Sequence, residues 1–350
     1  MRILHLTNHV LEVGNGIVNV AVDLAHGQAA EGHQVGFGSS GGGYEALLAE
    51  GGVEHFRLGI PGASLPGLAA PAALWRCLRR FKPDIVHAHM VKWAALARAF
   101  EPFHRYATVA TVHNVYQRSS RAMGACDGIV ALGEASRSII LGWGVAPEKV
   151  HVVVNAPLGT PRLPSASSVE PFRMESPSIV SVGGLFQRKG FGTLIEAFGS
   201  VLRARPTATL HIVGEGPDRP LFEAAAARVA PDRIFFHGFQ AEPRPFLKGA
   251  DVVVLASTRE SFPLVLLEAR EFGSRIVATD VDGNREALDG GAAGWLVPSE
   301  DPVSLGAAIL RAIDSTIPDG TTNGLDRYRV PALVERTSEI YAAALERRRR

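Results

Sequence analysis

Two glutamates eight positions apart, Glu260 and Glu268, are the residues best placed to do chemistry. They lie on either side of an expected helix start, and the apolar run at residues 251–257 before them is typical of a buried parallel strand. Pro263 suits the first position of that helix, because its fixed φ is already helical and its missing N–H would be unpaired there. The stretch therefore predicts a strand, a short loop and a helix, with one carboxylate on each side of the helix start.

The start of this helix would offer a site for an anion. The backbone amides of Leu264 and Val265 would point outward from the positive end of the helix dipole, which suits a phosphate. Glu268, about a turn further on, could accept hydrogen bonds from vicinal hydroxyls, as acidic residues do on a nucleotide ribose. Glu260 would face whatever group the phosphate carries. An ordinary helix with an acidic residue in its first turn explains the same residues, so the stretch alone leaves both interpretations open.

A glycine-rich basic loop at residues 183–190 follows another expected strand and opens a helix. Gly183 and Gly184 permit the turn, and Lys189 is a point charge that could neutralise a diphosphate. A second glycine turn, at residues 214–217, ends the next expected strand. Each feature alone could be a plain turn with a solvated lysine. Because all of them fall at the carboxyl ends of one expected sheet, together with the glutamates, they predict a nucleoside-diphosphate site.

The first half of the chain carries glycines after its first expected strand. Gly14 and Gly16 would allow a ligand to approach the backbone closely. A dinucleotide fingerprint would need a third glycine where Asn19 stands, and an acidic residue after the second strand, where residues 38–40 read Gly-Ser-Ser. The pattern therefore argues against an NAD site, and a plain loop remains an alternative.

Histidines gather in the same half. His87 and His89 share one strand face and resemble a metal pair, while His5 and His9 flank the end of the first strand. A structural zinc site needs four ligands, and the sequence offers no cysteine or carboxylate at a suitable spacing. We therefore expect most of these to be polar histidines with satisfied hydrogen bonds. His113 is the exception that we single out, because it ends a strand that should face a cleft.

Composition limits the class of protein. The chain has 350 residues, 46% of them hydrophobic and 20% charged, which favours about two domains with a sizeable core. Its net charge of +1 argues against nucleic-acid binding. The only cysteines, Cys77 and Cys126, cannot form a disulfide framework, so a reducing compartment fits. The first residues look like a strand rather than a signal peptide, and no apolar run is long enough to span a membrane. We expect a cytoplasmic protein.

Short apolar runs alternate with helical patterns along the chain, which predicts parallel, doubly wound sheets. We expect strands at residues 2–7, 34–38, 53–58, 84–89, 107–113, 128–132 and 150–154, and then at 178–182, 209–214, 234–238, 251–257 and 275–279. A Pro/Ser/Gly-rich linker at residues 157–177 separates the two series. The predicted domains are residues 1–160 and 161–329, facing each other across a cleft. A helix in residues 330–350 would pack back across the junction, and the arginines at its end would form a frayed tail.

At this point the sequence resembles the retaining glycosyltransferases of the two-Rossmann (GT-B) architecture, of the family 4 or group 1 type, over nearly the whole chain. The paired-glutamate motif of that family matches Glu260 and Glu268. Its glycine-to-lysine loop matches residues 183–190, and its glycine turn matches residues 214–217. Later landmarks resemble residues 278–286 and 294–298, and residues 84–89 resemble one in the first domain.

The resemblance implies a nucleotide-sugar donor on the second domain and an acceptor on the first. By carry-over, Lys189 holds the diphosphate, Glu268 the ribose hydroxyls and Glu260 the hydroxyls of the donor sugar. The donor contacts that this adds are Gly183 and the stretch of Phe262, Pro263, Leu264 and Val265. His113, with the loop of Gly14 and Gly16, would approach the donor from the opposite side, so the catalytic set would be Glu260, His113 and Lys189.

The family needs no metal and no cofactor, since the lysine and the helix dipole neutralise the phosphate, and UDP- or GDP-linked sugars are the expected donors. Retention of configuration, by front-side attack, is implied by the resemblance only. The family usually has an arginine directly after the first glycine of the lysine loop, where this chain has Gly184. We expect the neighbouring Arg188 to supply the missing charge. Ser-Phe-Pro after Glu260, and Asn155-Ala-Pro, are two further departures.

The predicted function is transfer of a sugar from a nucleoside diphosphate to a glycan or lipid-linked acceptor (EC 2.4), in polysaccharide or glycolipid biosynthesis. The alternative is a non-catalytic or partner-dependent protein that binds nucleotide sugars. A GT-B epimerase would need an acid/base pair that we cannot assign. The helix expected at residues 71–82 has an apolar face between arginines, which could contact the inner face of an anionic membrane. A helix that covers the sheet is favoured over that interpretation.

Overall fold

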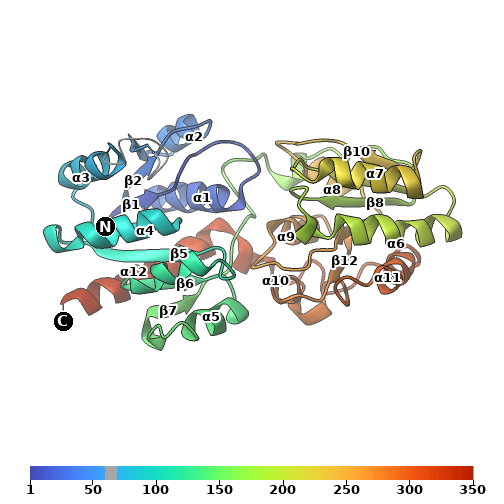
Figure 1. Ribbon diagram of the computed structural model, residues 1–350. Coiled ribbons are helices and arrows are strands. Elements are labelled where there is room, and N and C mark those ends of the chain that lie inside the picture. The colour runs from blue at the N-terminus through green and yellow to red at the C-terminus, as the bar shows by residue number, and fades with distance from the viewer. Residues whose placement is uncertain (60–68, 350) are drawn as a thin grey trace. The chain divides into compact units, whose positions relative to one another are not determined.

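The computed structural model describes residues 1–59 and 69–349, and the chain divides into two compact units. Unit 1 consists of residues 1–162 and 327–350, and unit 2 of residues 163–326. Each unit is an α/β structure with one parallel sheet (Figure 1). Within the described residues, no helix has both the length and the apolar run that crossing a membrane requires.

The described part of unit 1 has a parallel sheet of seven strands in the order β3-β2-β1-β4-β5-β6-β7. The strands are β1 (Arg2–Leu6), β2 (Gln34–Ser39), β3 (Glu54–Arg57), β4 (Ile85–Ala88), β5 (Ala107–Val112), β6 (Gly128–Ala131) and β7 (Val150–Val152). The helices are α1 (Gly16–Ala30), α2 (Glu45–Glu50), α3 (Ala69–Phe81), α4 (Val91–Phe100), α5 (Glu134–Leu141) and α12 (Val330–Arg349).

Unit 2, which is described throughout, has a parallel sheet of six strands in the order β10-β9-β8-β11-β12-β13. The strands are β8 (Ser178–Val182), β9 (Thr209–Val213), β10 (Ile234–Phe236), β11 (Val252–Leu255), β12 (Arg275–Thr279) and β13 (Trp295–Val297). The helices are α6 (Phe191–Ala204), α7 (Arg219–Val229), α8 (Arg244–Gly249), α9 (Leu264–Glu271), α10 (Asp282–Ala287) and α11 (Pro302–Asp314). The prediction of two doubly wound parallel sheets is confirmed.

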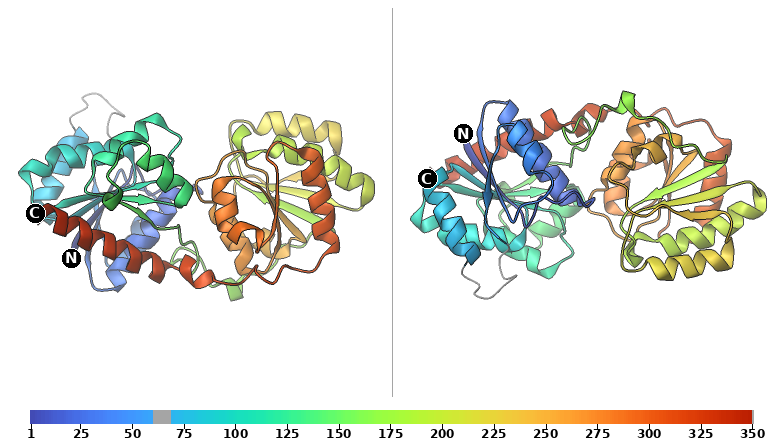
Figure 2. Two further views of the ribbon diagram at one scale, coloured as in Figure 1. Left: turned by 90° about the horizontal axis from the view of Figure 1, so that it is seen from below. Right: turned by 90° about the horizontal axis from the view of Figure 1, so that it is seen from above.

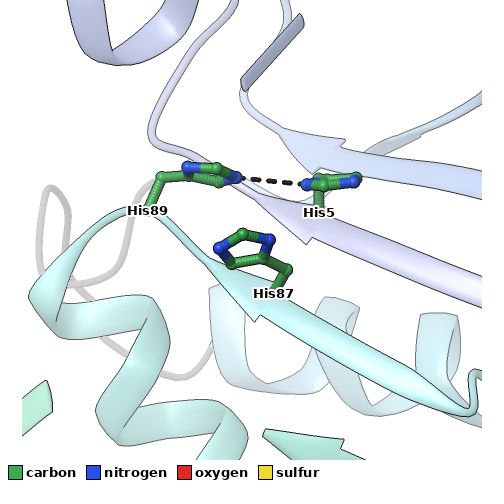
Figure 3. Close-up of side chains that lie close together, drawn as sticks. All are labelled: His5, His87 and His89. Carbon is green, nitrogen blue, oxygen red and sulfur yellow. Dashed lines mark hydrogen bonds between the residues drawn. The ribbon is translucent and has the colours of Figure 1, made fainter. Parts of the chain in front are cut away.

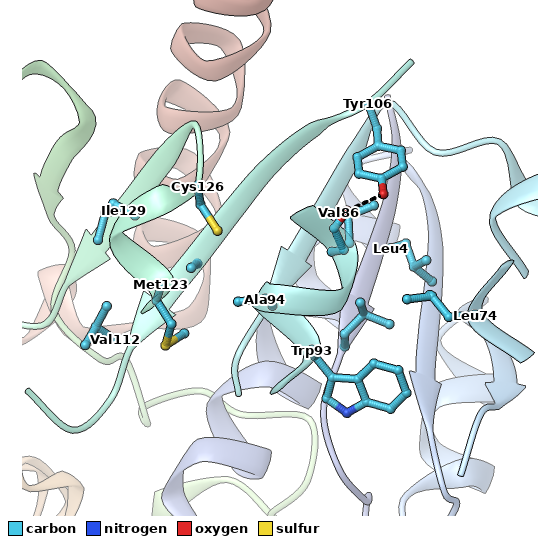
Figure 4. Packing of buried hydrophobic residues seen from close by; sticks show 14 of the residues in the cluster. Leu4, Leu74, Val86, Trp93, Ala94, Tyr106, Val112, Met123, Cys126 and Ile129 are labelled. Atoms are coloured by element: carbon cyan, nitrogen blue, oxygen red, sulfur yellow. Dashed lines mark hydrogen bonds between the residues drawn. The ribbon is translucent and has the colours of Figure 1, made fainter. Parts of the chain in front are cut away.

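One hydrophobic core of unit 1 lies between its sheet and helices α3 and α4, and another includes residues of β2, α1 and α2. Leu4 of β1, Leu74 of α3 and Trp93 of α4 are fully buried in the first of these cores, and the Tyr106 hydroxyl donates to the Ala97 carbonyl at 2.6 Å (Figure 4). The apolar side of α3 is thus covered by protein. The membrane-binding interpretation of this helix is wrong as far as its apolar face is concerned, because a face packed in the core cannot also enter a lipid surface.

The C-terminal helix α12 belongs to unit 1, where it contacts α1, β5 and β6. Figure 2 shows it in red along the blue and cyan elements of that unit. The expected frayed tail is wrong up to residue 349, since the helix continues to Arg349. Arg347 donates to the carbonyls of Asp127 at 3.2 Å and Glu148 at 2.9 Å, which holds its side chain against unit 1. Arg350 lies outside the described residues.

A buried ion pair fixes the start of the linker to α1. Arg162 donates two hydrogen bonds to the Asp23 carboxylate, at 2.8 and 2.9 Å, and the Thr160 hydroxyl donates a third at 2.6 Å. The side chains of Arg162 and Asp23 are 4% and 0% exposed. A bidentate pair with an extra hydrogen bond is the geometry that compensates for burying two charges.

Removing Arg162 would leave the Asp23 carboxylate buried without its counter-ion. Arg162→Met should therefore lower the free energy of unfolding by about 3–5 kcal/mol. The matched control is Arg205→Met, which breaks an Arg205–Asp314 pair whose side chains are 40% and 58% exposed, and it should change stability by no more than about 1 kcal/mol. Urea unfolding measures both. Equal effects of the two substitutions would contradict the anchoring role of Arg162.

Candidate functional site

The lysine loop of unit 2 (residues 183–190) is held by the glycine turn at residues 214–217, which follows the neighbouring strand. After β8 ends, the Leu185 amide donates to the Glu215 carbonyl at 2.9 Å, and the Asp218 amide donates to the Leu185 carbonyl at 3.1 Å. A single 3-10 turn, Gln187–Lys189, then leads into α6. The two glycine segments recognised in the sequence are therefore one hydrogen-bonded structure at the carboxyl edge of the sheet.

Gly190 brings the lysine loop against the end of β11. Its φ is +70°, in the left-handed region, and a Cβ at this position would lie 1.8 Å from the Ala256 carbonyl oxygen. Beside it, the Thr258 amide donates to the Arg188 carbonyl at 2.8 Å. Only a glycine fits such an approach, so the loops that carry Lys189 and Glu260 have a fixed separation.

The side chains of Lys189 and Glu260 are in direct contact. The Lys189 ammonium donates to Glu260 Oε1, and the Ser257 hydroxyl donates to the same oxygen at 2.7 Å. The Lys189 and Glu260 side chains are 17% and 9% exposed, so the pair is mostly withdrawn from water. Two predicted site residues that are 71 positions apart are thus brought together, in a contact that the motifs did not predict.

The loop of Glu260 is supported from the end of β12. The Gly283 amide donates to the Glu260 carbonyl at 3.2 Å, and a Cβ on Gly283 would lie 2.7 Å from that oxygen. The Thr279 hydroxyl donates to the Ser257 carbonyl, and the Asn284 amide group donates to the Thr279 carbonyl at 2.9 Å. These supports fall in the landmark at residues 278–286, where the sequence showed a resemblance but no role.

Helix α9 begins one residue later than predicted. Pro263 is the N-cap, with an extended backbone (φ −84°, ψ 117°), and Leu264 is the first helical residue. The prediction that Pro263 occupies the first helical position is therefore wrong, because its ψ is not helical. Val265 and Glu268 lie in this helix as expected, and Glu268 is half-buried one turn beyond its start. Phe262 is buried beside them.

Arg270 anchors α9 and was missed in the sequence. Its side chain is fully buried and donates to the carbonyls of Ala287 at 2.7 Å, Thr321 at 2.8 Å and Asn323 at 2.8 Å. A lone arginine in a helix usually indicates a solvated face, so the sequence carried no signal for this role. Its hydrogen bonds fix the helix that bears Glu268.

In unit 1, the Gly14 loop leads into α1. Gly14 has φ +64° and is exposed, and Gly16 is the first residue of the helix. The side chain of Asn15 between them accepts from the Ile17 amide at 3.1 Å and so caps the helix. This capping role of Asn15 was also missed.

His5 of β1, His87 of β4 and His89, which directly follows β4, form a buried hydrogen-bonded cluster in unit 1 (Figure 3). His5 Nδ1 lies 3.1 Å from His89 Nε2, and the rings of His87 and His89 stack with centroids 4.4 Å apart. The remaining ring nitrogens bond to Gln28 Oε1 (from His5, 2.8 Å), the Tyr341 hydroxyl and Thr111 hydroxyl (from His87, 2.7 Å each) and His113 Nε2 (from His89, 3.3 Å). The expectation of satisfied histidines is confirmed for His5, His87 and His89.

Burial keeps these histidines neutral. Loss of hydration lowers the pKa of His5 to about 4 and the pKa of His113 to about 3. It also holds the pKa values of His87 and His89 well below the usual value of a histidine. His113, which is half-buried just after β5, is the member of the cluster nearest to the carboxyl edge of the sheet.

Comparisons with known proteins agree with this architecture. The family model described as Glycosyltransferase Family 4 matches residues 14–156, and the one described as Glycosyl transferases group 1 matches residues 176–315. The lipopolysaccharide core biosynthesis glycosyltransferase LpsE of Rhizobium meliloti (strain 1021) is 29% identical over 271 residues, 76% of this chain and 74% of that protein. The glycogen synthase of Mycobacterium tuberculosis (strain ATCC 25618 / H37Rv) is 27% identical over 297 residues, 76% of this chain and 70% of that protein.

Among solved structures, Anabaena Alr3699/HepE in complex with UDP-glucose is similar with a TM-score of 0.80 and 19% identity, over 97% of this chain and 98% of that one. The chain has the fold of the GT-B glycosyltransferases, and this fold defines the class of protein to which it belongs. The chain belongs to the family 4, or group 1, glycosyltransferases. It is an enzyme of the hexosyltransferase type, which favours catalysis over the non-catalytic alternative.

Because a side chain at Gly190 would collide with the Ala256 carbonyl, Gly190→Ala should cost about 2 kcal/mol or more in unfolding free energy. The matched control is Gly192→Ala, where a Cβ meets nothing within 4 Å. This control lies inside α6 and should gain about 0.5–1 kcal/mol from helix propensity. Urea unfolding distinguishes the two, and a Gly190→Ala variant as stable as the wild type would refute the close approach.

The neutral histidines should also make unit 1 sensitive to acid. Their folded pKa values lie below the unfolded value of about 6.5, so their contribution is complete above that pH and is lost as the pH falls toward the folded pKa values. The unfolding free energy should decrease by up to about 1.4 kcal/mol per pH unit for each such histidine. Tryptophan fluorescence in urea, from about pH 7.5 to 5, reports mainly on unit 1, which holds Trp75, Trp93 and Trp143. A stability independent of pH in this window would contradict the buried neutral state.

Proposed function

We propose that this glycosyltransferase moves a sugar from a nucleoside-diphosphate donor, without a metal ion and with retention of configuration, to a glycan or lipid-linked acceptor. The observation that carries the proposal is the Lys189–Glu260 pair, which lies at the carboxyl edge of the unit 2 sheet beside the start of α9. It combines a cation for a phosphate with a carboxylate for sugar hydroxyls.

The donor diphosphate would take the place of Glu260 at Lys189. Phosphate oxygens carry more negative charge than one carboxylate, and the positive end of α9 at Leu264 and Val265 adds to their stabilisation. Arg188, which is exposed with its guanidinium 5.7 Å from the Phe186 ring centroid, is the second cation of the proposal. These groups neutralise the departing diphosphate in the way that a metal ion does in other transferases.

Displacement from Lys189 gives Glu260 its function. The carboxylate keeps the hydrogen bond from Ser257 and can then accept hydrogen bonds from hydroxyls of the donor sugar. Glu268, one turn along α9, accepts from the ribose hydroxyls. In this proposal the two partners of the pair separate when the donor binds.

In the transfer step the anomeric carbon–oxygen bond to the diphosphate breaks while a bond to the acceptor oxygen forms on the same face. The electron pair stays on the phosphate, and a phosphate oxygen takes the proton of the acceptor hydroxyl. Positive charge that develops on the sugar lies near the Glu260 carboxylate, and negative charge on the phosphate lies near Lys189. Stabilising both charges lowers the barrier.

His113 and the Gly14–Gly16 loop belong to unit 1, and the proposal keeps them as donor contacts. The acceptor class is supported by the name of LpsE, a lipopolysaccharide core biosynthesis enzyme. A cytoplasmic location, with a peripheral contact at the inner face of a membrane, also remains part of the proposal. Any such contact would have to use residues other than the buried face of α3.

Thermal shift with UDP-, GDP- and ADP-sugars tests donor binding, since a ligand at 100 times its Kd stabilises by about 2.7 kcal/mol. The shift should appear in the wild type and be abolished in Lys189→Ala, which removes the diphosphate cation. Arg188→Ala should reduce it. The control Arg203→Ala, on the exposed surface of α6, should keep it. Unchanged donor affinity and turnover in Arg188→Ala would show that Arg188 does not bind the donor. An intact thermal shift in Lys189→Ala would refute the proposal.

A further inference from the structure

Two chains of hydrogen bonds start at the side-chain amide of Gln28 in the buried histidine cluster of unit 1. One leads to His113 and the other to His87. We call these chains the two arms of a relay. Gln28 of α1 is fully buried and presents its oxygen to His5 Nε2 at 2.8 Å and its NH2 group to the Tyr341 hydroxyl at 3.2 Å. An amide oxygen only accepts and an amide nitrogen only donates. Gln28 therefore assigns a direction to each hydrogen bond that leaves it.

The first arm runs from Gln28 to His113. Since Gln28 Oε1 accepts, the proton of neutral His5 is on Nε2, and His5 Nδ1 must accept from His89 Nε2. His89 Nδ1 then carries no proton and must accept a hydrogen bond from His113 Nε2, 3.3 Å away. One neutral ring after another is left with a single tautomer.

The second arm agrees with the first. The Tyr341 hydroxyl accepts from Gln28 and therefore gives its own proton to His87 Nδ1, at 2.7 Å. The proton of His87 is then on Nε2 and goes to the Thr111 hydroxyl, at 2.7 Å. If the oxygen and the nitrogen of the Gln28 amide exchanged places, the donor and acceptor of every hydrogen bond in both arms would also exchange. A combination of the two directions would leave a buried group without a hydrogen-bond partner.

We propose that Gln28 is a positioning residue that fixes the tautomer of His113, with the proton on Nε2 and a bare Nδ1. His113 then presents a hydrogen-bond acceptor, and its ligand must be a hydrogen-bond donor such as a sugar hydroxyl. The relay reaches from α1 and the C-terminal helix to the edge of the sheet. It makes His113 neither a cation for phosphate nor a donor to a carbonyl.

The link between this tautomer and the donor rests on the proposed function, whereas the tautomer itself belongs to the ligand-free protein. Nitrogen-15 NMR of ring-labelled histidine, with long-range proton–nitrogen correlations, identifies the protonated nitrogen of each ring. At about pH 7.5 the wild type should show His113 with its proton on Nε2. A proton on Nδ1, or comparable amounts of both tautomers, would overturn the proposal without any variant.

Gln28→Leu tests the source of the effect. Without the amide, the two directions of the relay become similar in energy, and His113 should change from one tautomer to a mixture. The matched control is His237→Phe, which disrupts the His211–His237 pair of unit 2 (2.9 Å) and has no connection to His113. It should leave the His113 signals unchanged. A single Nε2–H tautomer in folded Gln28→Leu would show that the amide does not control the relay.

The two proposals fail separately. A wild type with the expected tautomer but no thermal shift with any nucleotide sugar would refute donor binding and leave the relay standing. A donor-binding wild type with Nδ1–H at His113 would do the reverse.

Discussion

The ion pair between Lys189 and Glu260 is the interaction on which the site depends. It joins the loop after β8 to the loop after β11, and it holds both side chains mostly away from water. A pair of this kind is stable only while no stronger anion competes for the lysine. The pair orders the Lys189 and Glu260 side chains, and under the proposed function a diphosphate takes the place of Glu260 at the lysine.

The position of the pair is set by close backbone contacts. Gly190 against Ala256 fixes the lysine loop, and Gly283 against Glu260 fixes the glutamate loop, in each case at a distance that a Cβ would not permit. Arg270 holds α9 through buried carbonyls. Rigid supports of this kind allow a small site to stabilise charge without reorganising during the reaction.

Much of the fold follows from the sequence, because buried parallel strands are short apolar runs and their alternation with helices is easy to recognise. The strand β13 and the helices α8, α10 and α11 were missed. The six-residue α8 and α10 carry little periodicity, whereas α11 has a start signal, Asp301 followed by Pro302, that could have revealed it. The motifs located Lys189 and Glu260 but not their contact, which requires β8 and β11 to be neighbours in the sheet. Arg270 and Gln28 were missed because a single polar residue in a helix gives no sign of what it meets inside.

Nucleotide affinity in Glu260→Gln tests the central claim most directly. Titration calorimetry with UDP, which has no sugar for Glu260 to bind, compares the wild type with this variant. If Glu260 competes with the nucleotide for Lys189, losing the carboxylate frees the lysine, and UDP should bind more tightly by about fivefold, or roughly 1 kcal/mol, even though transfer is lost. Unchanged or weaker UDP binding would contradict the exchange of partners at Lys189.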